Sequence, residues 1–124
     1  MPQEELEREI AAGVEFWGYD EGGELTGVMG IQPLDDVDLI RHAYVAPGSQ
    51  RKGIGGALLR HVSATATRPI LVGTWAQADW AIRFYRRHGF EAVPPNTAAA
   101  LLRTYWTIPE RQIETSVVLA RPPL

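Results

Sequence analysis

Hydrophobic residues recur with two different periods along the chain, and each period predicts a different kind of element. Near the start, Leu6 and Ile10 lie four residues apart among glutamates, which predicts an amphipathic helix over residues 2–12. Aromatic and β-branched residues then fill 14–19, and an apolar run follows at 25–31 after a glycine pair. Two such runs joined by a tight turn predict a β-hairpin.

Apolar and polar residues alternate up to residue 45, and beyond it apolar residues recur at helical spacing. Alternation over 37–45 first predicts a third antiparallel strand, and a turn rich in glycine follows it. Beyond that turn we expect a helix to about residue 67, a strand at 70–74, a helix at 76–88, a strand at 90–93, a short helix at 96–108 and a strand at 115–119. A chain of 124 residues can bury one core, so we expect a single domain, 1–124.

Two of these helices carry further local signals. In the helix before residue 88, Trp80, Phe84 and Tyr85 are expected to cluster on one side, and Gly89 is expected to end the helix. The short helix that follows should be capped by its first polar residues, Asn96 or Thr97.

Composition narrows the function classes. Hydrophobic residues make up 45% of the chain and charged residues 22%, the balance of a folded protein rather than a disordered one. The net charge of −3 argues against nucleic-acid binding. Without cysteine, neither disulfides nor a cysteine-ligated metal is expected. Because residues 1–10 lack a signal-peptide pattern and no run reaches the roughly 20 apolar residues of a membrane span, we expect a cytoplasmic protein without membrane contact.

The glycine-rich turn carries the clearest chemical signal. A strand that feeds such a turn and then a helix brings several free backbone N–H groups to one point, where they favour an anion. Gly53, Gly55 and Gly56 let the backbone approach a pyrophosphate closely, while Arg51 and Lys52 add positive charge. The same glycines would also suit a tight turn with close helix packing, so this motif alone leaves both interpretations open.

A second motif lies one strand further on, where residues 81–90 read Ala-Ile-Arg-Phe-Tyr-Arg-Arg-His-Gly-Phe. With Val45, Pro47 and the run Gln-Arg-Lys-Gly-Ile-Gly at 50–55, it resembles the GNAT superfamily of acetyl-CoA-dependent acetyltransferases. These residues match that superfamily's Arg/Gln-x-x-Gly-x-Gly/Ala turn and its Ala-x-x-Phe-Tyr-x-x-x-Gly-Phe helix end. The resemblance runs from about residue 14 to residue 90.

The resemblance implies an α/β (α+β) fold with a mixed, mostly antiparallel central sheet flanked by helices. It also implies an N-acetyltransferase that uses acetyl-CoA as co-substrate, needs no metal and acetylates a primary amine. Direct transfer in a ternary complex fits a chain without a cysteine nucleophile. Small-molecule and peptide amines both remain open as acceptors. A non-catalytic acyl-CoA-binding sensor or regulatory module is the alternative.

The sequence departs from the superfamily pattern in two places. The chain begins close to its first hairpin, so we expect a shortened N-terminal part, for which a homodimer could supply a wall of the acceptor pocket. Ala78 stands where the superfamily often has an asparagine, which removes one expected contact to the pantetheine region.

The resemblance assigns coenzyme A binding to the turn, to the strand before it and to one helix end. Backbone amides of the turn would hold the pyrophosphate, from Gln50, Arg51, Lys52, Gly53, Ile54, Gly55 and Gly56. The pantetheine arm would pair with the backbone of Tyr44 and Val45. Arg87 would contact the 3′-phosphate, although its charge also suits the dipole at the end of its helix.

Three residues are candidates for proton transfer. Tyr85 matches the superfamily's tyrosine that protonates the departing thiolate, and a phenol with an ordinary pKa of about 10 is protonated at neutral pH. A packed aromatic residue of an amphipathic helix is the alternative for Tyr85. The general base is open between Asp38 and His42 on the third strand. An ordinary surface or core histidine is the alternative for His42, and a solvated turn for the aspartates near it.

Overall fold

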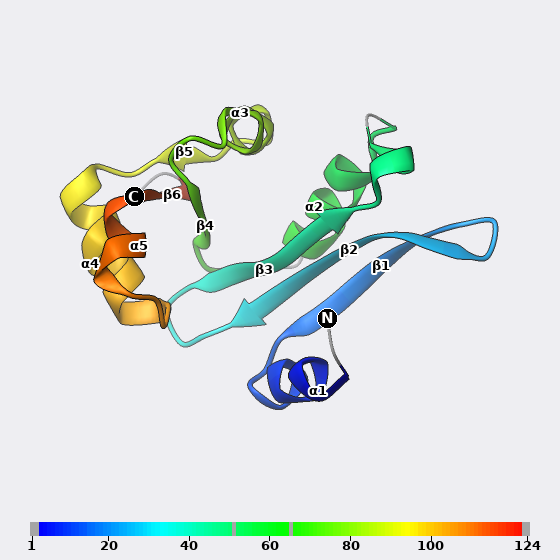
Figure 1. Ribbon diagram of the computed structural model, residues 1–124, viewed down its shortest axis with the longest axis horizontal. Helices are drawn as coiled ribbons and strands as arrows, with labels where there is room; N and C mark the ends of the chain where they lie inside the picture. Colours follow the sequence, from blue (N-terminus) through cyan, green and yellow to red (C-terminus); the bar gives the residue numbers. More distant parts are fainter. Residues whose placement is uncertain (1–2, 51, 65, 123–124) are drawn as a thin grey trace. The chain divides into compact units, whose positions relative to one another are not determined.

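The computed structural model of the chain describes residues 3–50, 52–64 and 66–122 (Figure 1). The chain forms two compact units, residues 1–68 and residues 69–124. Each unit combines strands with helices, and the strand pairings described inside each unit are antiparallel. The predicted fold class, a mixed α/β fold with mostly antiparallel strands flanked by helices, is confirmed.

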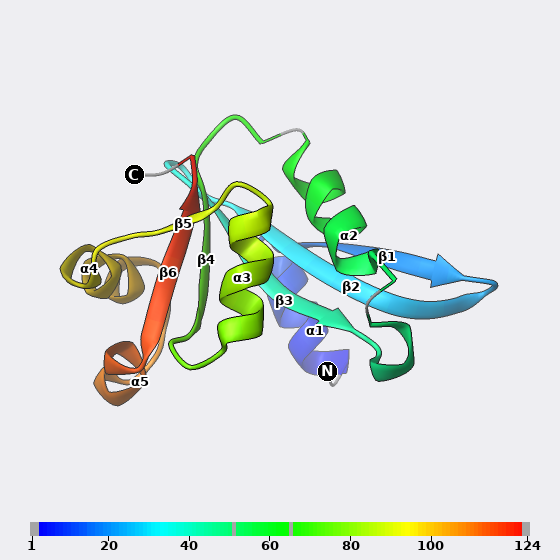
Figure 2. The ribbon, with the colours of Figure 1, turned by 90° about the horizontal axis from the view of Figure 1, so that it is seen from above.

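The first unit contains the predicted three-stranded antiparallel sheet, in the order β1-β2-β3. Its elements are α1 (Gln3–Ala11), β1 (Glu15–Glu21), β2 (Glu24–Pro33), β3 (Asp38–Val45), a 3-10 turn η1 (Pro47–Ser49) and α2 (Ile54–Ser63). Helices α1 and α2 lie on opposite faces of this sheet (Figures 1 and 2).

Helix α2 packs against the sheet at a position that only glycine allows. A Cβ atom on Gly27 would lie 2.7 Å from Ile54 Cγ2 and 3.0 Å from Leu58 Cδ1, so the helix approaches the β2 backbone directly. Ile54, Leu58 and Leu59 are buried on this face of the helix. The predicted hydrophobic stripe therefore holds the glycine-rich turn firmly against the sheet.

The second unit has its own antiparallel strands, with β6 between β4 and β5. Its elements are β4 (Ile70–Trp75), α3 (Asp79–Arg87), β5 (Glu91–Ala92), α4 (Pro95–Tyr105), α5 (Glu110–Glu114) and β6 (Ser116–Arg121). Helix α3 lies on one side of β4 and β6, whereas α4 and α5 lie on the other (Figures 1 and 2). Gly89 follows α3 with φ +89°, as predicted for the residue that ends this helix.

Several predicted elements were too long: α3 spans Asp79–Arg87 rather than 76–88, and α4 ends at Tyr105 rather than at residue 108. The helix expected to reach residue 67 ends at Ser63, with Ala64 as its C-cap, and Pro69 disfavours helical backbone at the residue before it.

The strand expected at 90–93 has strand geometry only at Glu91 and Ala92. The Val93 N–H still donates to the Val118 carbonyl at 2.9 Å, and Pro94, which has no N–H, ends this pairing.

Other local predictions in the second unit were wrong. Proline 95 opens α4 and Pro94 is its N-cap, so neither Asn96 nor Thr97 caps that helix. Trp80 is 73% exposed, because the buried stripe of α3 is formed by Ala81 and Tyr85 instead. Helix α5 was not predicted at all, since five residues are too few for a helical period to be recognised.

Candidate functional site

The glycine-rich turn forms the helix N-terminus that the sequence predicts. Gly53 is the N-cap of α2 and adopts the left-handed conformation, with φ +79° and ψ 10°. The first bond inside the helix runs from Ala57 N–H to the Gly53 carbonyl at 3.0 Å. Because the leading amides of a helix have no intrahelical acceptor, those of Ile54, Gly55 and Gly56 are the donors that an anion would use.

Side chains fasten this turn to the tip of the β1–β2 hairpin. Ser49 Oγ donates to Glu21 Oε1 at 2.9 Å, and Lys52 Nζ lies 3.6 Å from Glu21 Oε2. Gln50 Nε2 donates to the Val45 carbonyl at 3.3 Å, which ties the turn back to the strand before it. The hydrogen bond from Ser49 is the main cause that lowers the pKa of Glu21. The predicted site residue at position 51 lies outside the described residues.

A β-bulge interrupts β3 just before the turn. Val28 pairs with Tyr44 and Gly30 pairs with Arg41, so two residues of β3, His42 and Ala43, lie between pairs that flank a single residue of β2. His42 adopts φ +54°, which is uncommon for a residue other than glycine. Strained backbone of this kind persists where the surroundings hold it, and it often accompanies a functional site.

Two neighbours hold the His42 side chain in place. Its Nε2 lies 3.0 Å from Glu9 Oε1 of α1, and its ring stacks on Phe16 at a centroid distance of 5.9 Å. The His42 side chain is 32% exposed, and that of Glu9 is 29% exposed. Neither of these partners was predicted from the sequence.

The other candidate base, Asp38, sits in a different environment at the start of β3. Its side chain is 5% exposed, and Arg68 Nη2 lies 2.9 Å from its Oδ1. The orientation of the two groups does not meet hydrogen-bond geometry, although the distance is that of an ion pair. Burial beside a guanidinium favours a structural carboxylate, whereas His42 remains open to a ligand.

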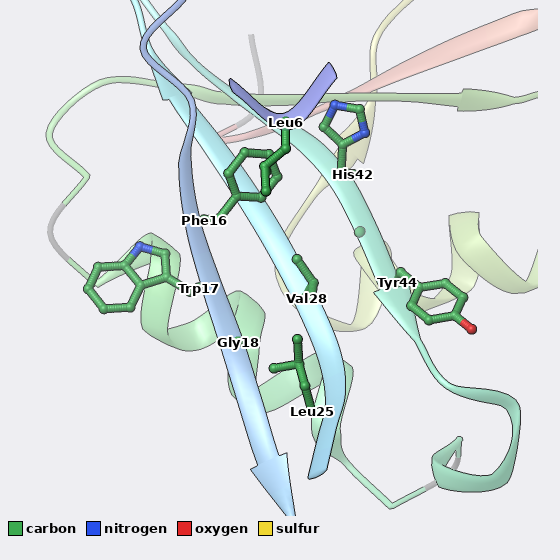
Figure 3. Close-up of a pocket in the computed structure, with 9 residues that line it drawn as sticks. Leu6, Phe16, Trp17, Gly18, Leu25, Val28, His42 and Tyr44 are labelled. Carbon is green, nitrogen blue, oxygen red and sulfur yellow. The ribbon is translucent and has the colours of Figure 1, made fainter. Parts of the chain in front are cut away.

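A groove lies on the face of the first sheet that α1 covers. It encloses about 620 Å³ and is lined by Leu6, Phe16, Trp17, Gly18, Leu25, Val28, His42, Ala43 and Tyr44. Figure 3 shows Leu6, Phe16, His42 and Tyr44 around it, while the Trp17 ring points away. That ring packs edge-on against His61 of α2, at 4.4 Å. Only the helix and the strands that carry these residues could be predicted from the sequence, because the groove depends on how α1 lies on the sheet.

Tyr85 belongs to the second unit and is buried in an aromatic cluster. Its ring packs edge-on against Phe84 and Phe90, with centroid distances of 5.0 and 5.5 Å. Burial raises the pKa of Tyr85 to about 12. The phenol is therefore protonated throughout the neutral range. Arg87 is exposed in the last turn of the same helix.

The described residues show neither a metal-binding cluster nor a membrane-spanning helix. Among the residues that the structure describes, no group of three or more histidine, aspartate or glutamate side chains is arranged to hold a metal ion. Within the same ranges, no helix combines the length and the hydropathy needed to cross a membrane.

Comparison with known protein families identifies the fold and its motifs. A profile of the Acetyltransferase (GNAT) domain matches residues 12–92. The chain belongs to the GNAT acetyltransferase family. The matched region includes the β1–β2 hairpin, the bulged strand, the glycine-rich turn and α3, so these elements belong to the GNAT domain.

Several GNAT proteins are similar to this chain. An uncharacterized N-acetyltransferase of Escherichia coli, YedL, is 30% identical over 89 residues, which are 66% of this chain and 56% of that protein. A GNAT family acetyltransferase from Elizabethkingia anophelis, with acetyl-CoA bound, has a TM-score of 0.70 at 23% identity, over 96% of this chain and 81% of the other. The IAA acetyltransferase from Bacillus cereus has a TM-score of 0.71 at 21% identity, over 96% and 83%. The GNAT chain described here thus spans little more than half of the Escherichia coli relative.

Proposed function

We propose that this chain is an N-acetyltransferase that moves the acetyl group of acetyl-CoA directly to a primary amine in a ternary complex. The observation that carries the proposal is the N-terminus of α2, where Gly53 and the leading amides form an anion site in a chain of the GNAT family. We further propose that residues 1–124 act as one acetyl-CoA-binding domain in the cytoplasm. A chain without cysteines has no disulfide that the reducing cytoplasm could break.

Coenzyme A would be held mainly by backbone groups. The amides of residues 50–56 would bind the pyrophosphate, with the α2 dipole adding to their attraction. Tyr44 and Val45, at the end of the bulged strand, would pair with the pantetheine arm through their backbone. Arg87 would contact the 3′-phosphate, a role that rests on the family resemblance alone.

The chemistry requires one base and one donor. The acceptor arrives as an ammonium ion, and His42 accepts one of its protons. The freed nitrogen then attacks the thioester carbonyl carbon, and the bond from that carbon to sulfur breaks. The nitrogen gives up a second proton as the amide forms, and the departing thiolate gains one. The products are the acetylated amine, the coenzyme A thiol and a protonated His42 that returns its proton to solvent.

Tyr85 would serve the departing thiolate as a hydrogen-bond donor. With a pKa of about 12, its phenol is a weaker acid than a thiol with an ordinary pKa of about 8.5. Complete transfer of its proton is therefore uphill, and the phenol contributes by donating to the charge that develops on sulfur. If it gives up its proton, the nitrogen that forms the amide restores it.

A thermal melt with and without acetyl-CoA, combined with thiol release in the presence of amines, tests this function. Ligand at 100 times its dissociation constant stabilises a fold by about 2.7 kcal/mol, which gives a shift of several degrees. A shift together with amine-dependent thiol release supports the proposal. A shift without release for any amine supports the non-catalytic sensor instead, and no shift at saturation overturns coenzyme A binding itself.

A further inference from the structure

Building on the proposed function, we propose that the groove beside His42 binds acceptors whose single amine is carried on an apolar body, and that Glu9 orients His42 toward that amine. This acceptor class and the positioning role of Glu9 follow from the lining of the groove, the Glu9–His42 contact, the strained backbone of His42 and the place of α1 beside both.

The lining of the groove favours an apolar acceptor. Aliphatic, aromatic and glycine residues form most of its wall, and its volume of about 620 Å³ suits a small organic molecule. Among the described residues that line it, none is a carboxylate, lysine or arginine. A polyamine would bring a second ammonium group against this wall, where the nearby Glu9 carboxylate is already engaged by His42, and burial of an unpaired charge is strongly unfavourable.

The contact with Glu9 fixes which nitrogen of His42 can act. An ionised carboxylate only accepts hydrogen bonds, so a neutral His42 must carry its proton on Nε2 and donate it to Glu9 Oε1 at 3.0 Å. The lone pair then resides on Nδ1, which is the atom that accepts the proton from the ammonium ion. A carboxylate that selects the histidine tautomer in this way raises the fraction of productive side-chain orientations.

Both the backbone and the ring of His42 are restrained. The bulge forces φ to +54°, an arrangement that costs free energy, and the stacked Phe16 ring restricts the imidazole. Phe16 is also part of the groove wall. The residue that would contact the body of the acceptor therefore also positions the base.

Helix α1 supplies both parts of the proposed recognition. Leu6 and Glu9 are three residues apart and lie on one face of the helix, with Leu6 in the groove wall and Glu9 on His42. An acceptor that fills the groove would contact Leu6 one turn away from the carboxylate that orients the base. Binding of the apolar body is thus linked to the geometry of proton transfer.

The acceptor class is tested with pairs of amines that differ in one group. Hexylamine and 1,6-diaminohexane share a carbon chain, and the dipeptide amides Phe-Ala and Asp-Ala share a peptide amine. We expect kcat/KM to be at least about tenfold higher for the apolar member of each pair. Higher kcat/KM for the alkylamine pair indicates a small-molecule acceptor, and higher kcat/KM for the dipeptide pair indicates a peptide acceptor. Equal or better use of the charged members overturns the proposal.

A binding measurement decides the same question if no amine is turned over. Hexylamine is titrated into the protein saturated with coenzyme A, and again into the variant Leu6→Asn. Weaker binding to the variant by about tenfold, with coenzyme A affinity unchanged, supports the groove. Equal affinity for both proteins overturns it. If the unaltered protein does not bind coenzyme A, the proposed function itself is wrong.

The role of Glu9 is tested with two substitutions. Glu9→Ala should lower kcat by about tenfold while KM for acetyl-CoA stays unchanged, because only the orientation of His42 is lost. Glu9→Gln should recover most of the lost kcat, since its amide oxygen still accepts from Nε2–H. The control is Glu4→Ala, an exposed carboxylate on the same helix. The role is excluded if Glu9→Ala retains full kcat, or if Glu9→Gln is as slow as Glu9→Ala.

Discussion

Ser49 Oγ donates a 2.9 Å hydrogen bond to Glu21 Oε1, and this bond joins the turn before α2 to the tip of the first hairpin. The second oxygen of the same carboxylate lies 3.6 Å from Lys52 Nζ. A negative charge therefore sits beside the proposed pyrophosphate site and holds one of its cations.

Replacing Glu21 with glutamine should tighten coenzyme A binding. The substitution removes a negative charge near the pyrophosphate and releases Lys52, so we expect affinity to rise about threefold at low salt and less at high salt. Calorimetric titration at two salt concentrations measures this, with Glu24→Gln on the same hairpin as the control. Weaker binding by Glu21→Gln would mean that the carboxylate orders the turn rather than competing with the ligand.

Replacing Ser49 with alanine should destabilise the fold in a pH-dependent way. The Ser49 hydrogen bond lowers the pKa of Glu21 below its ordinary value of 4.5 in the folded state. A depressed folded-state pKa adds stability above the ordinary pKa, and that stability is lost as the pH falls through the lower value. Urea unfolding of both proteins at pH 7 and at pH 3 should show a gap that narrows in acid. A gap of equal size at both pH values would contradict this assignment.

Tyr85→Phe should change how stability depends on alkaline pH. Since the folded-state pKa of about 12 exceeds the ordinary value of 10, the phenol contributes stability that is complete below pH 10 and is lost as the pH rises toward 12. The unaltered protein should lose about 2–3 kcal/mol more than the variant over that window.

Ultraviolet titration of the tyrosines provides the direct measurement for this residue. Of the four tyrosines, one should ionise about two pH units late in the unaltered protein, and that step should be absent from Tyr85→Phe. If all tyrosines of the unaltered protein titrate together near pH 10, burial does not raise the pKa of Tyr85.

Gly53→Ala should weaken both the fold and coenzyme A binding. A Cβ at this position meets nothing within 4 Å, so the effect comes from φ +79° alone and should be about 1 kcal/mol. The control is Gly13→Ala, where φ is +97° and the surroundings are also open. Both variants should unfold more easily, but only Gly53→Ala should bind coenzyme A less tightly. Equal coenzyme A affinity in both variants would mean that the turn at Gly53 does not bind the ligand.

Much of the fold was predictable because it rests on local signals. The first hairpin, the strand at 37–45 and the glycine that begins α2 follow from residue type and spacing within short windows. The second motif, at 81–90, could be recognised for the same reason. Whether its tyrosine acts in catalysis stays a prediction.

The contacts that shape the candidate site were not predictable in this way. Glu9 and His42 are 33 residues apart, and Glu21 and Ser49 are 28 apart, so no local pattern joins them. Their meeting depends on how α1 and the hairpin tip lie against the sheet. The strand pattern at 37–45 also concealed the bulge, because an extra residue in a ladder changes pairing without changing composition.

The bulge in β3 changes which residues of that strand share a face. Arg41 pairs with Gly30 and Tyr44 with Val28, so side chains three apart take equivalent positions where an unbroken strand would need an even spacing. An odd-numbered residue, Arg41, and an even-numbered one, Tyr44, therefore face the same side of the sheet before and after the bulge. Deleting Ala43 would leave Arg41 and Tyr44 opposite Gly30 and Val28 but only two residues apart, so the ladder would become regular and His42 alone would stand opposite Met29. One inserted residue thus lets a single strand both pair regularly in the sheet and place His42, Ala43 and Tyr44 in the groove wall.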